Sequence, residues 1–224
     1  LVETLGWRQT FQVLAAVTLV IGLIAAWMLV PNPAARGLYP DGDAHSGGES
    51  ASLSGMSMQA ALRSKPFWLL FSASAIISLG LFVPFVHLAK FSQDHGHADS
   101  LSILLISLIG VGSMSGRLTL GGLADRFGRH RAMIAMFLGI AMVQVWWYSS
   151  TAYWALVVYA VLFGLFYGGY VALAPALAAD YFGTRNVGGI LGVQYSSIAM
   201  GTLIGPVAAG FAFDLTGAYE LPIA

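Results

Sequence analysis

Six apolar segments, each close to or above the roughly 20 residues that a helix needs to cross a bilayer, dominate the sequence. They are residues 10–30, 67–89, 100–120, 132–149, 154–179 and 187–213. Lipid offers no partner to an unpaired backbone group, and the alternation of a membrane β-strand is absent, so each segment is expected to be a helix. Glycine pairs spaced four residues apart, such as Gly112 with Gly116 and Gly201 with Gly205, predict close helix contacts. The predicted fold class is all-α, a polytopic membrane helix bundle.

The composition agrees with a membrane protein, since 58% of the residues are hydrophobic and only 9% are charged, against roughly 25% in a soluble domain. The net charge is zero, so no nucleic-acid partner is expected. The lack of cysteine excludes disulfides and thiol chemistry. No common catalytic motif occurs, so neither an enzyme nor a cofactor is predicted. The H-x-H spacing of His95 and His97 is more simply a solvated loop than a metal site.

The basic residues are distributed unevenly between the two sets of connections between helices. One side of the membrane would carry seven, and the other only Arg8 and Lys90. The seven are Arg36, Arg63, Lys65, Arg126, Arg129, Arg131 and Arg185. By the positive-inside rule, the polar stretch 31–66 and the loop 121–131 are cytoplasmic in a multi-pass protein of the cell membrane. The stretch holds a flexible linker and then MSMQAALRS, which is able to form a short interfacial helix.

The stretch GRLTLGGLADRFGRHR, residues 116–131, gathers charges at the end of one apolar segment. Cytoplasmic placement is enough to explain the arginines of the loop. Gly121 and Gly122 permit a tight exit from the preceding helix, and Gly128 permits a turn before the next one. Asp125 is able to bind the positive N-terminus of the last helix, which starts on the same side. Such a contact would act as a clasp that holds two parts of the bundle together in one conformation and releases them in another.

This stretch resembles the signature G-x-x-x-D-R-x-G-R-R of the major facilitator superfamily, in the copy between membrane helices 8 and 9. The matching residues are Gly121, Asp125, Arg126, Gly128 and Arg129. The resemblance implies that residues 1–30 are the last helix of an N-terminal half and that residues 31–66 link the two halves. Residues 67–224 are then a C-terminal bundle of helices 7 to 11, with the start of the twelfth near its end. Asp180 and Arg185 bracket the next cytoplasmic loop and are assigned to the same clasp.

Within the superfamily, the chain looks most like monocarboxylate-transporter-like and oxalate/formate-antiporter-like members, as in FVPFVHLAKFSQDHG at 82–96. Arg117 lies eight residues before Asp125, where an arginine binds the substrate carboxylate in those families. An ionised group inside a membrane helix is costly and usually faces a cavity or a partner. A guanidinium is able to hold a carboxylate through two parallel hydrogen bonds. The alternative is that Arg117 snorkels to the interface or pairs with Asp125 or Asp180.

Four further substrate-binding candidates lie at membrane depth: Tyr167, Tyr170, Gln194 and Tyr195. Such side chains either shape a central cavity or pack against lipid and neighbouring helices. His87, after Pro84 near the outer end of its helix, is either a proton-linked group or an interfacial residue.

These observations predict a secondary transporter of the major facilitator type that carries a small organic anion, such as a monocarboxylate, by alternating access as a symporter or antiporter. Ser113 stands where monocarboxylate carriers often have Asp, which argues against proton coupling through that position. The alternatives are a receptor-like or assembly domain that retains the fold, or a carrier for a drug-like or sugar substrate. The expected partners are the anion, the lipid bilayer and a missing N-terminal half. Both ends look like cuts, since Leu1 rather than Met opens the chain, so this fragment is not expected to transport alone.

Overall fold

The computed structural model describes residues 2–28 and 55–217. Most of the linker 31–66 and the predicted start of a further helix near Tyr219 lie outside the described residues. The chain divides into two units, Leu1–Ser52 and Leu53–Ala224, and each is described by itself. The described residues form helices and no strand, apart from one isolated bridge between Gly55 and Gly183. The all-α prediction is therefore confirmed.

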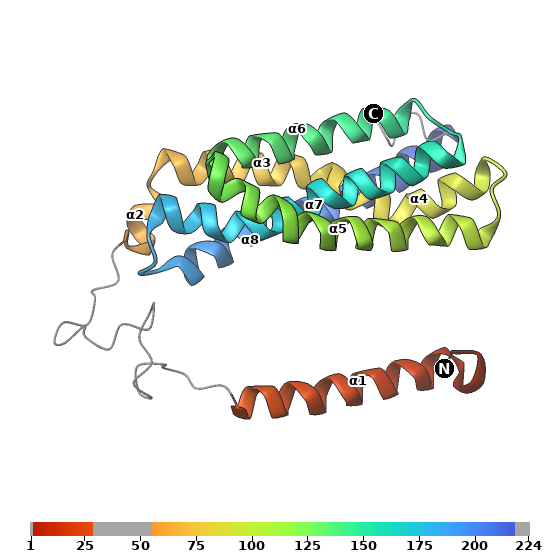
Figure 1. Cartoon of the computed structure of the whole chain (residues 1–224), viewed down its shortest axis with the longest axis horizontal. Helices are drawn as coiled ribbons and strands as arrows, with labels where there is room; N and C mark the ends of the chain where they lie inside the picture. Colours follow the sequence, from red (N-terminus) through yellow and green to blue (C-terminus); the bar gives the residue numbers. More distant parts are fainter. Residues whose placement is uncertain (1, 29–54, 218–224) are drawn as a thin grey trace. The chain divides into compact units, whose positions relative to one another are not determined.

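The first unit holds one helix, α1 (Val2–Met28), drawn in red in Figure 1. Gly6 interrupts it with a φ of 73°, and the hydroxyl of Thr10 donates to the Gly6 carbonyl over 2.9 Å. The stretch Gly6–Met28 is long and apolar enough to span a membrane. Most of its side chains from Trp7 to Met28 are apolar and exposed, so this helix requires lipid or other helices around it.

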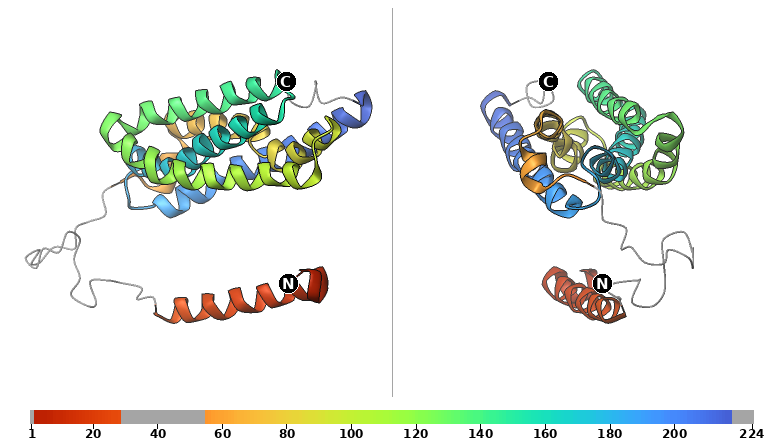
Figure 2. Two further views of the ribbon diagram at one scale, coloured as in Figure 1. Left: turned by 45° about the vertical axis from the view of Figure 1, so that its right-hand side comes forward. Right: turned by 90° about the vertical axis from the view of Figure 1, so that its left-hand side faces the viewer.

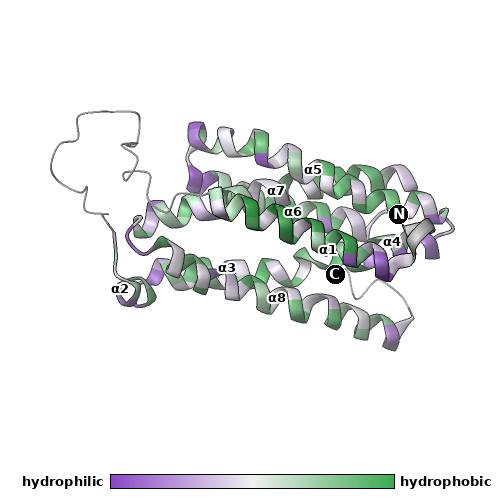
Figure 3. Cartoon of the chain, turned by 90° about the horizontal axis from the view of Figure 1, so that it is seen from below, coloured by the Kyte–Doolittle hydropathy of each residue, from purple (hydrophilic) through white to green (hydrophobic). Residues whose placement is uncertain are grey.

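The second unit contains the remaining helices. They are α2 (Met58–Leu62), α3 (Lys65–Leu81), α4 (Val83–Asp94), α5 (Asp99–Phe127), α6 (Arg129–Tyr148), α7 (Tyr153–Phe182) and α8 (Val187–Thr216). With α3 and α4 taken as one span, the unit has five candidate membrane spans, and α1 brings the described chain to six. The six predicted segments are thus confirmed, and α2 is the short helix expected in MSMQAALRS. Hydrophilic residues gather mainly near the helix ends (Figure 3).

Two helix pairs form the closest contacts, α5 with α7 and α3 with α8 (Figure 2). At Gly116 a Cβ atom would overlap the backbone carbonyl of Leu165 in α7, and at Gly205 it would overlap that of Leu79 in α3. The helices approach this closely because glycine has no side chain. The helix contacts predicted from the glycine pairs are confirmed.

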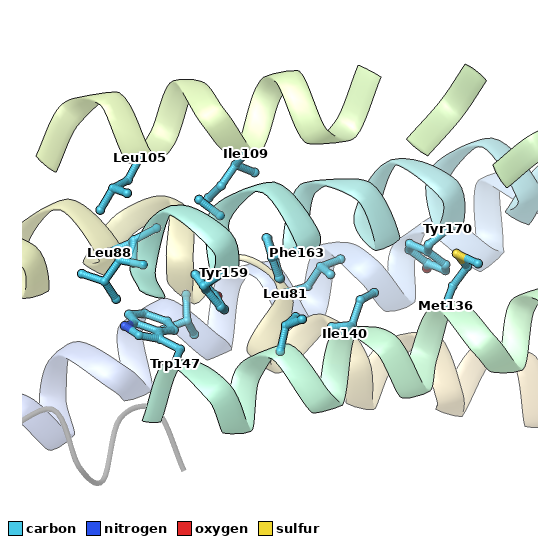
Figure 4. Packing of buried hydrophobic residues seen from close by; sticks show 14 of the residues in the cluster. Leu81, Leu88, Leu105, Ile109, Met136, Ile140, Trp147, Tyr159, Phe163 and Tyr170 are labelled. Carbon is cyan, nitrogen blue, oxygen red and sulfur yellow. The ribbon is translucent and has the colours of Figure 1, made fainter. Parts of the chain in front are cut away.

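The largest group of buried side chains joins α4, α5, α6 and α7 (Figure 4). Trp147, Tyr159 and Phe163 are fully buried in it. The ring centroids of Trp147 and Tyr159 lie 5.2 Å apart, and those of Tyr159 and Phe163 lie 5.6 Å apart. This aromatic column fixes α7 against α6.

The segment 67–89, predicted as one helix, is broken near Pro84, because α3 ends at Leu81 and α4 begins at Val83. Phe82 is the cap residue of both helices, and Pro84 lies in the first turn of α4. A proline is well accommodated at the start of a helix and poorly accommodated inside one. The sequence PFVHLAKFSQD therefore begins a new helix rather than continuing the old one.

The expected exit from the helix at Gly121 and Gly122 is wrong, because α5 continues through both glycines to Phe127. Two glycines weaken a helix by only about 1 kcal/mol each, and Ala124 beyond them is buried and anchors the extra turns. The turn lies at Gly128 alone, where φ is 94°. A positive φ favours glycine, so this part of the expectation is confirmed.

The end of the linker belongs to the second unit and packs against the connection between α7 and α8. The backbone N–H of Met56 donates to the Phe182 carbonyl over 2.8 Å, and the side-chain amide of Asn186 donates to the Met56 carbonyl over 3.1 Å. Ala61 and Phe67 then pack in a small apolar cluster with Phe182. Residues 55–67 are in this way fixed to the connection between α7 and α8.

Candidate functional site

A groove of about 380 Å³ opens between α4, α5 and α7. Most of the side chains along it are apolar, and Arg117 is the single cation among them. The lining residues are Phe85, Ile109, Gly110, Ser113, Met114, Arg117, Leu118 and Tyr167. A cleft of this size suits a small molecule, and one cation on an apolar wall suits a single negative charge.

Arg117 lies on an exposed face of α5, within the membrane span Asp99–Phe127. No ion pair joins it to an acid among residues 2–28 and 55–217. The two acids considered as partners, Asp125 and Asp180, both pair with Arg129 instead. A guanidinium at membrane depth costs roughly 2.5–3.5 kcal/mol by insertion scales, so an anionic ligand would offset a substantial penalty there.

Tyr167 lies in the same groove and is half-buried. Its ring is stacked on Phe163, at 6.2 Å between centroids and 3° between planes, and meets Phe85 edge-on at 5.6 Å. These contacts hold the ring against the aromatic column, so the groove has one rigid aromatic wall. Phe85 was missed in the sequence, although its position directly after Pro84 marks the first turn of a new helix.

The other three candidates lie outside this groove. Tyr170 is buried and packs on Phe137 of α6, with ring centroids 5.5 Å apart, and lies beside Met136 (Figure 4). Gln194 is buried, and its amide nitrogen lies 3.4 Å from the Ser74 hydroxyl of α3. Tyr195 is exposed on α8. The structure therefore brings together Arg117 and Tyr167 in this groove, which Tyr170, Gln194 and Tyr195 do not line.

The charged residues at the α5–α6 turn form a three-helix ion cluster. The guanidinium of Arg129 lies 2.9 Å from the Asp125 carboxylate of α5 and 2.8 Å from the Asp180 carboxylate of α7. Asp125 thus pairs with Arg129, and no hydrogen bond within the described chain joins it to the start of α8. Arg126 and Arg185 are exposed and take part in no ion pair of the described residues. Gly121 lies one turn before Asp125, and Gly128 provides the turn that places Arg129 opposite both acids.

A second polar contact lies beside this cluster and was not foreseen. The hydroxyl of Tyr181 lies 2.9 Å from Nδ1 of His130, and so joins α7 to the first turn of α6. The two residues are neighbours of Asp180 and Arg129, so both contacts hold the same helix ends. The end of the bundle near Gly128 is thereby tied across α5, α6 and α7.

His87 joins α4 to α8 at the other end of the bundle. Its Nε2 lies 3.1 Å from the Pro206 carbonyl, and the side chain is half-buried. The role in proton coupling stays a prediction. In the neighbouring loop, His95 contacts the Phe91 carbonyl and His97 the Thr151 carbonyl. Across the described ranges, no three potential ligands converge as a metal site would need.

Comparison of the sequence with known proteins identifies the family to which the chain is similar. The model of the Major Facilitator Superfamily matches residues 1–147 and, again, residues 100–222. Monocarboxylate transporter 12 of Xenopus laevis is 32% identical over 161 residues, which is 69% of this chain and 35% of that protein. Monocarboxylate transporter 4 of Rattus norvegicus is 28% identical over 222 residues, or 96% of this chain and 46% of that protein.

A fungal relative is named as an efflux protein. The aspyridones efflux protein of Emericella nidulans is 29% identical over 149 residues, covering 66% of this chain and 31% of that protein. The chain thus spans between about a third and a half of the length of the relatives it matches.

Proposed function

The chain belongs to the Major Facilitator Superfamily, and we propose that it forms part of a secondary transporter that moves a small organic anion, such as a monocarboxylate, by alternating access. It is a multi-pass membrane protein without an enzyme's role. In this proposal an N-terminal half supplies the other wall of the cavity, and the linker 31–66 and the α5–α6 turn face the cytoplasm in the cell membrane.

Arg117 is the observation that carries this proposal. It is a cation in a membrane span, it lines the groove, and no acid of the described chain neutralises it. A carboxylate placed there would form two charge-assisted hydrogen bonds. Ser113, one turn before Arg117 on α5, and the hydroxyl of Tyr167 add neutral donors in the same groove. The names of the monocarboxylate transporter relatives support the same substrate class.

The ion cluster of Asp125, Arg129 and Asp180 is assigned to the conformational clasp, together with Arg126, Arg185 and the two glycines of the motif, Gly121 and Gly128. Its ion pairs tie α5, α6 and α7 at one end of the bundle. These pairs are partly exposed, so each is weak and able to exchange partners during a conformational change. Arg126 and Arg185 are then the cations available to an N-terminal half.

The other substrate-binding candidates have a place in the complete cavity. Tyr195 is exposed on α8, and we assign it to a surface that the N-terminal half completes. Tyr170 and Gln194 support the packing of α7 and α8 behind that surface. His87 is assigned to the closing of the end opposite the clasp, where it holds α4 against α8.

Uptake of labelled lactate by cells that express the chain within a complete carrier tests the proposal. We expect Arg117→Ala to abolish saturable uptake, while Arg117→Lys retains part of it because one cation remains. Met114→Ala, on the same groove, serves as a matched control for altered shape, and surface labelling confirms equal insertion of all variants. Unchanged uptake by Arg117→Ala would exclude the proposed role. Uptake of an uncharged, drug-like substrate in its place would favour an efflux function like that named for the fungal relative.

A further inference from the structure

The break between α3 and α4 leaves a backbone carbonyl without its usual donor. In a continuous helix the N–H of residue 84 would donate to the carbonyl of Gly80, but Pro84 has no N–H. Both residues lie inside the membrane span Lys65–Asp94. An unpaired carbonyl in that environment costs several kcal/mol unless a neighbouring helix supplies a donor, because no water is at hand.

Gln144 of α6 supplies this donor. Its side-chain amide nitrogen donates to the Gly80 carbonyl over 2.9 Å. The absence of a side chain at Gly80 makes room for the amide, since a Cβ atom there would lie 3.3 Å from the same nitrogen. The contact therefore depends on a glycine of α3, a proline of α4 and a glutamine of α6.

Tyr159 of α7 fixes the orientation of that amide. Its hydroxyl donates to Oε1 of Gln144 over 2.6 Å, and its side chain is fully buried in the aromatic column. With the oxygen accepting from Tyr159, the nitrogen of the amide points to Gly80. The chain of contacts thus runs from α7 through α6 to the end of α3.

The position of α4 decides one wall of the groove. Phe85 follows Pro84 directly, and its ring lies 6.1 Å from Phe163 and 5.6 Å from Tyr167, between centroids. Phe85 and Tyr167 both line the groove that contains Arg117. A change in the angle between α3 and α4 would move Phe85 away from Tyr167 and widen the groove at Arg117.

We propose that Gln144 and Tyr159 are positioning residues that replace the hydrogen bond lost at Pro84 and thereby hold α4 at the angle that places Phe85 in the substrate groove. Neither residue lines the groove itself. The identification of the groove as an anion site rests on the proposed function, whereas the hydrogen-bond arrangement at the helix break does not.

A double-mutant cycle between positions 84 and 144 tests this inference. The chain contains no cysteine, so spin labels can be attached to cysteines introduced at two exposed sites, Val86 on α4 and Val111 on α5. The distance distribution between the labels is measured with the chain in lipid nanodiscs. Gln144→Met keeps the length of the side chain and removes the donor. Pro84→Ala restores a backbone N–H that is able to reach the Gly80 carbonyl.

We expect Gln144→Met to broaden or shift the distance distribution in the presence of Pro84 and to have no effect in the Pro84→Ala background. Tyr159→Phe, which removes only the hydroxyl, should give a smaller change in the same direction, and it keeps the test decisive if Gln144→Met fails to insert. Thr202→Val is the control, because its hydroxyl bonds only within α8. Equal broadening by Gln144→Met in both backgrounds, or none in either, would overturn the inference.

Lactate binding by the same variants within a complete carrier separates this inference from the proposed function. Loss of one hydrogen bond corresponds to about a fivefold effect, so Gln144→Met should weaken lactate binding by about that factor while Pro84 is present and not in the Pro84→Ala background. If the distances follow the prediction and the unsubstituted carrier does not bind lactate, the positioning role stands and the anion proposal is wrong. If lactate binds but the distances do not respond to Gln144→Met, the positioning role is wrong.

Discussion

Gly116→Ala should destabilise the bundle, because Gly116 lies at a close approach of α5 and α7. A Cβ atom at this position would overlap the carbonyl oxygen of Leu165. It would also lie 2.9 Å from the carbonyl carbon of Leu165 and 3.0 Å from the amide nitrogen of Gly169. All these atoms belong to the backbone, so no rotation of a side chain relieves the overlap. The helices have to separate by about 1 Å, which forfeits a quarter to a half of the dispersion energy of each contact that opens.

The expected magnitude follows from two opposing terms. Overpacking of a tight interface costs about 1–3 kcal/mol, whereas glycine to alanine inside an unobstructed helix stabilises by about 0.5–1 kcal/mol. Gly122→Ala, in the same helix and with open space around its Cβ position, is the matched control and shows only the second term. The propensity gain is common to both variants, so the difference between them is expected to be the overpacking cost alone, about 1–3 kcal/mol.

Unfolding by sodium dodecyl sulfate in mixed micelles, followed by the loss of helical circular dichroism, measures this difference. Gly116→Ala should unfold at a lower mole fraction of the detergent than the unsubstituted chain, and Gly122→Ala at an equal or higher one. Two variants with the same unfolding free energy would refute the packing described for α5 and α7.

Three shorter predictions concern the site and its surroundings. Arg129→Gln should speed amide hydrogen exchange at the clasp ends of α5, α6 and α7, because its pairs with both acids are lost, whereas Arg126→Gln should leave exchange unchanged. Ser113→Asp would place a carboxylate one turn from Arg117 and should weaken lactate binding at least about tenfold at pH 7. Binding should recover at a pH low enough to protonate the new carboxyl group. Full binding at pH 7 would contradict a site with a single cation. Asn186→Ala removes the donor to the segment before α2, and faster exchange there by about fivefold is expected from the loss of one hydrogen bond.

The membrane spans could be predicted from the sequence because a run of apolar residues has few alternatives in lipid. The boundaries were less certain where packing rather than hydropathy decides them. Gly121 and Gly122 looked like a helix end, yet the burial of Ala124 carries α5 past them. The glycine pairs predicted the contact surfaces correctly, since helix backbones can approach closely wherever glycine leaves no side chain between them.

The site was predictable only in part. Arg117 stands out in the sequence because a charge at membrane depth needs a reason, and Tyr167 does lie in its groove. Which of the other polar residues face the groove depends on the rotation of each helix, which long apolar helices do not reveal by periodicity. Tyr170 is three residues from Tyr167 yet packs on α6. The contact from Gln144 to Gly80 joins residues 64 positions apart, so no local sequence pattern predicts it.

The central claim, that Arg117 binds a carboxylate in the groove, is tested most directly by the binding of lactate and of lactamide to a complete carrier that contains the chain, in lipid nanodiscs. The two compounds share a shape and differ in charge, and saturation-transfer difference NMR detects ligands that bind weakly. We predict saturation transfer to lactate that reaches a plateau as the lactate concentration rises. Added lactamide should not reduce this transfer, and Arg117→Gln should abolish it. Equal transfer to both compounds, or transfer to lactate that survives Arg117→Gln, would contradict the account.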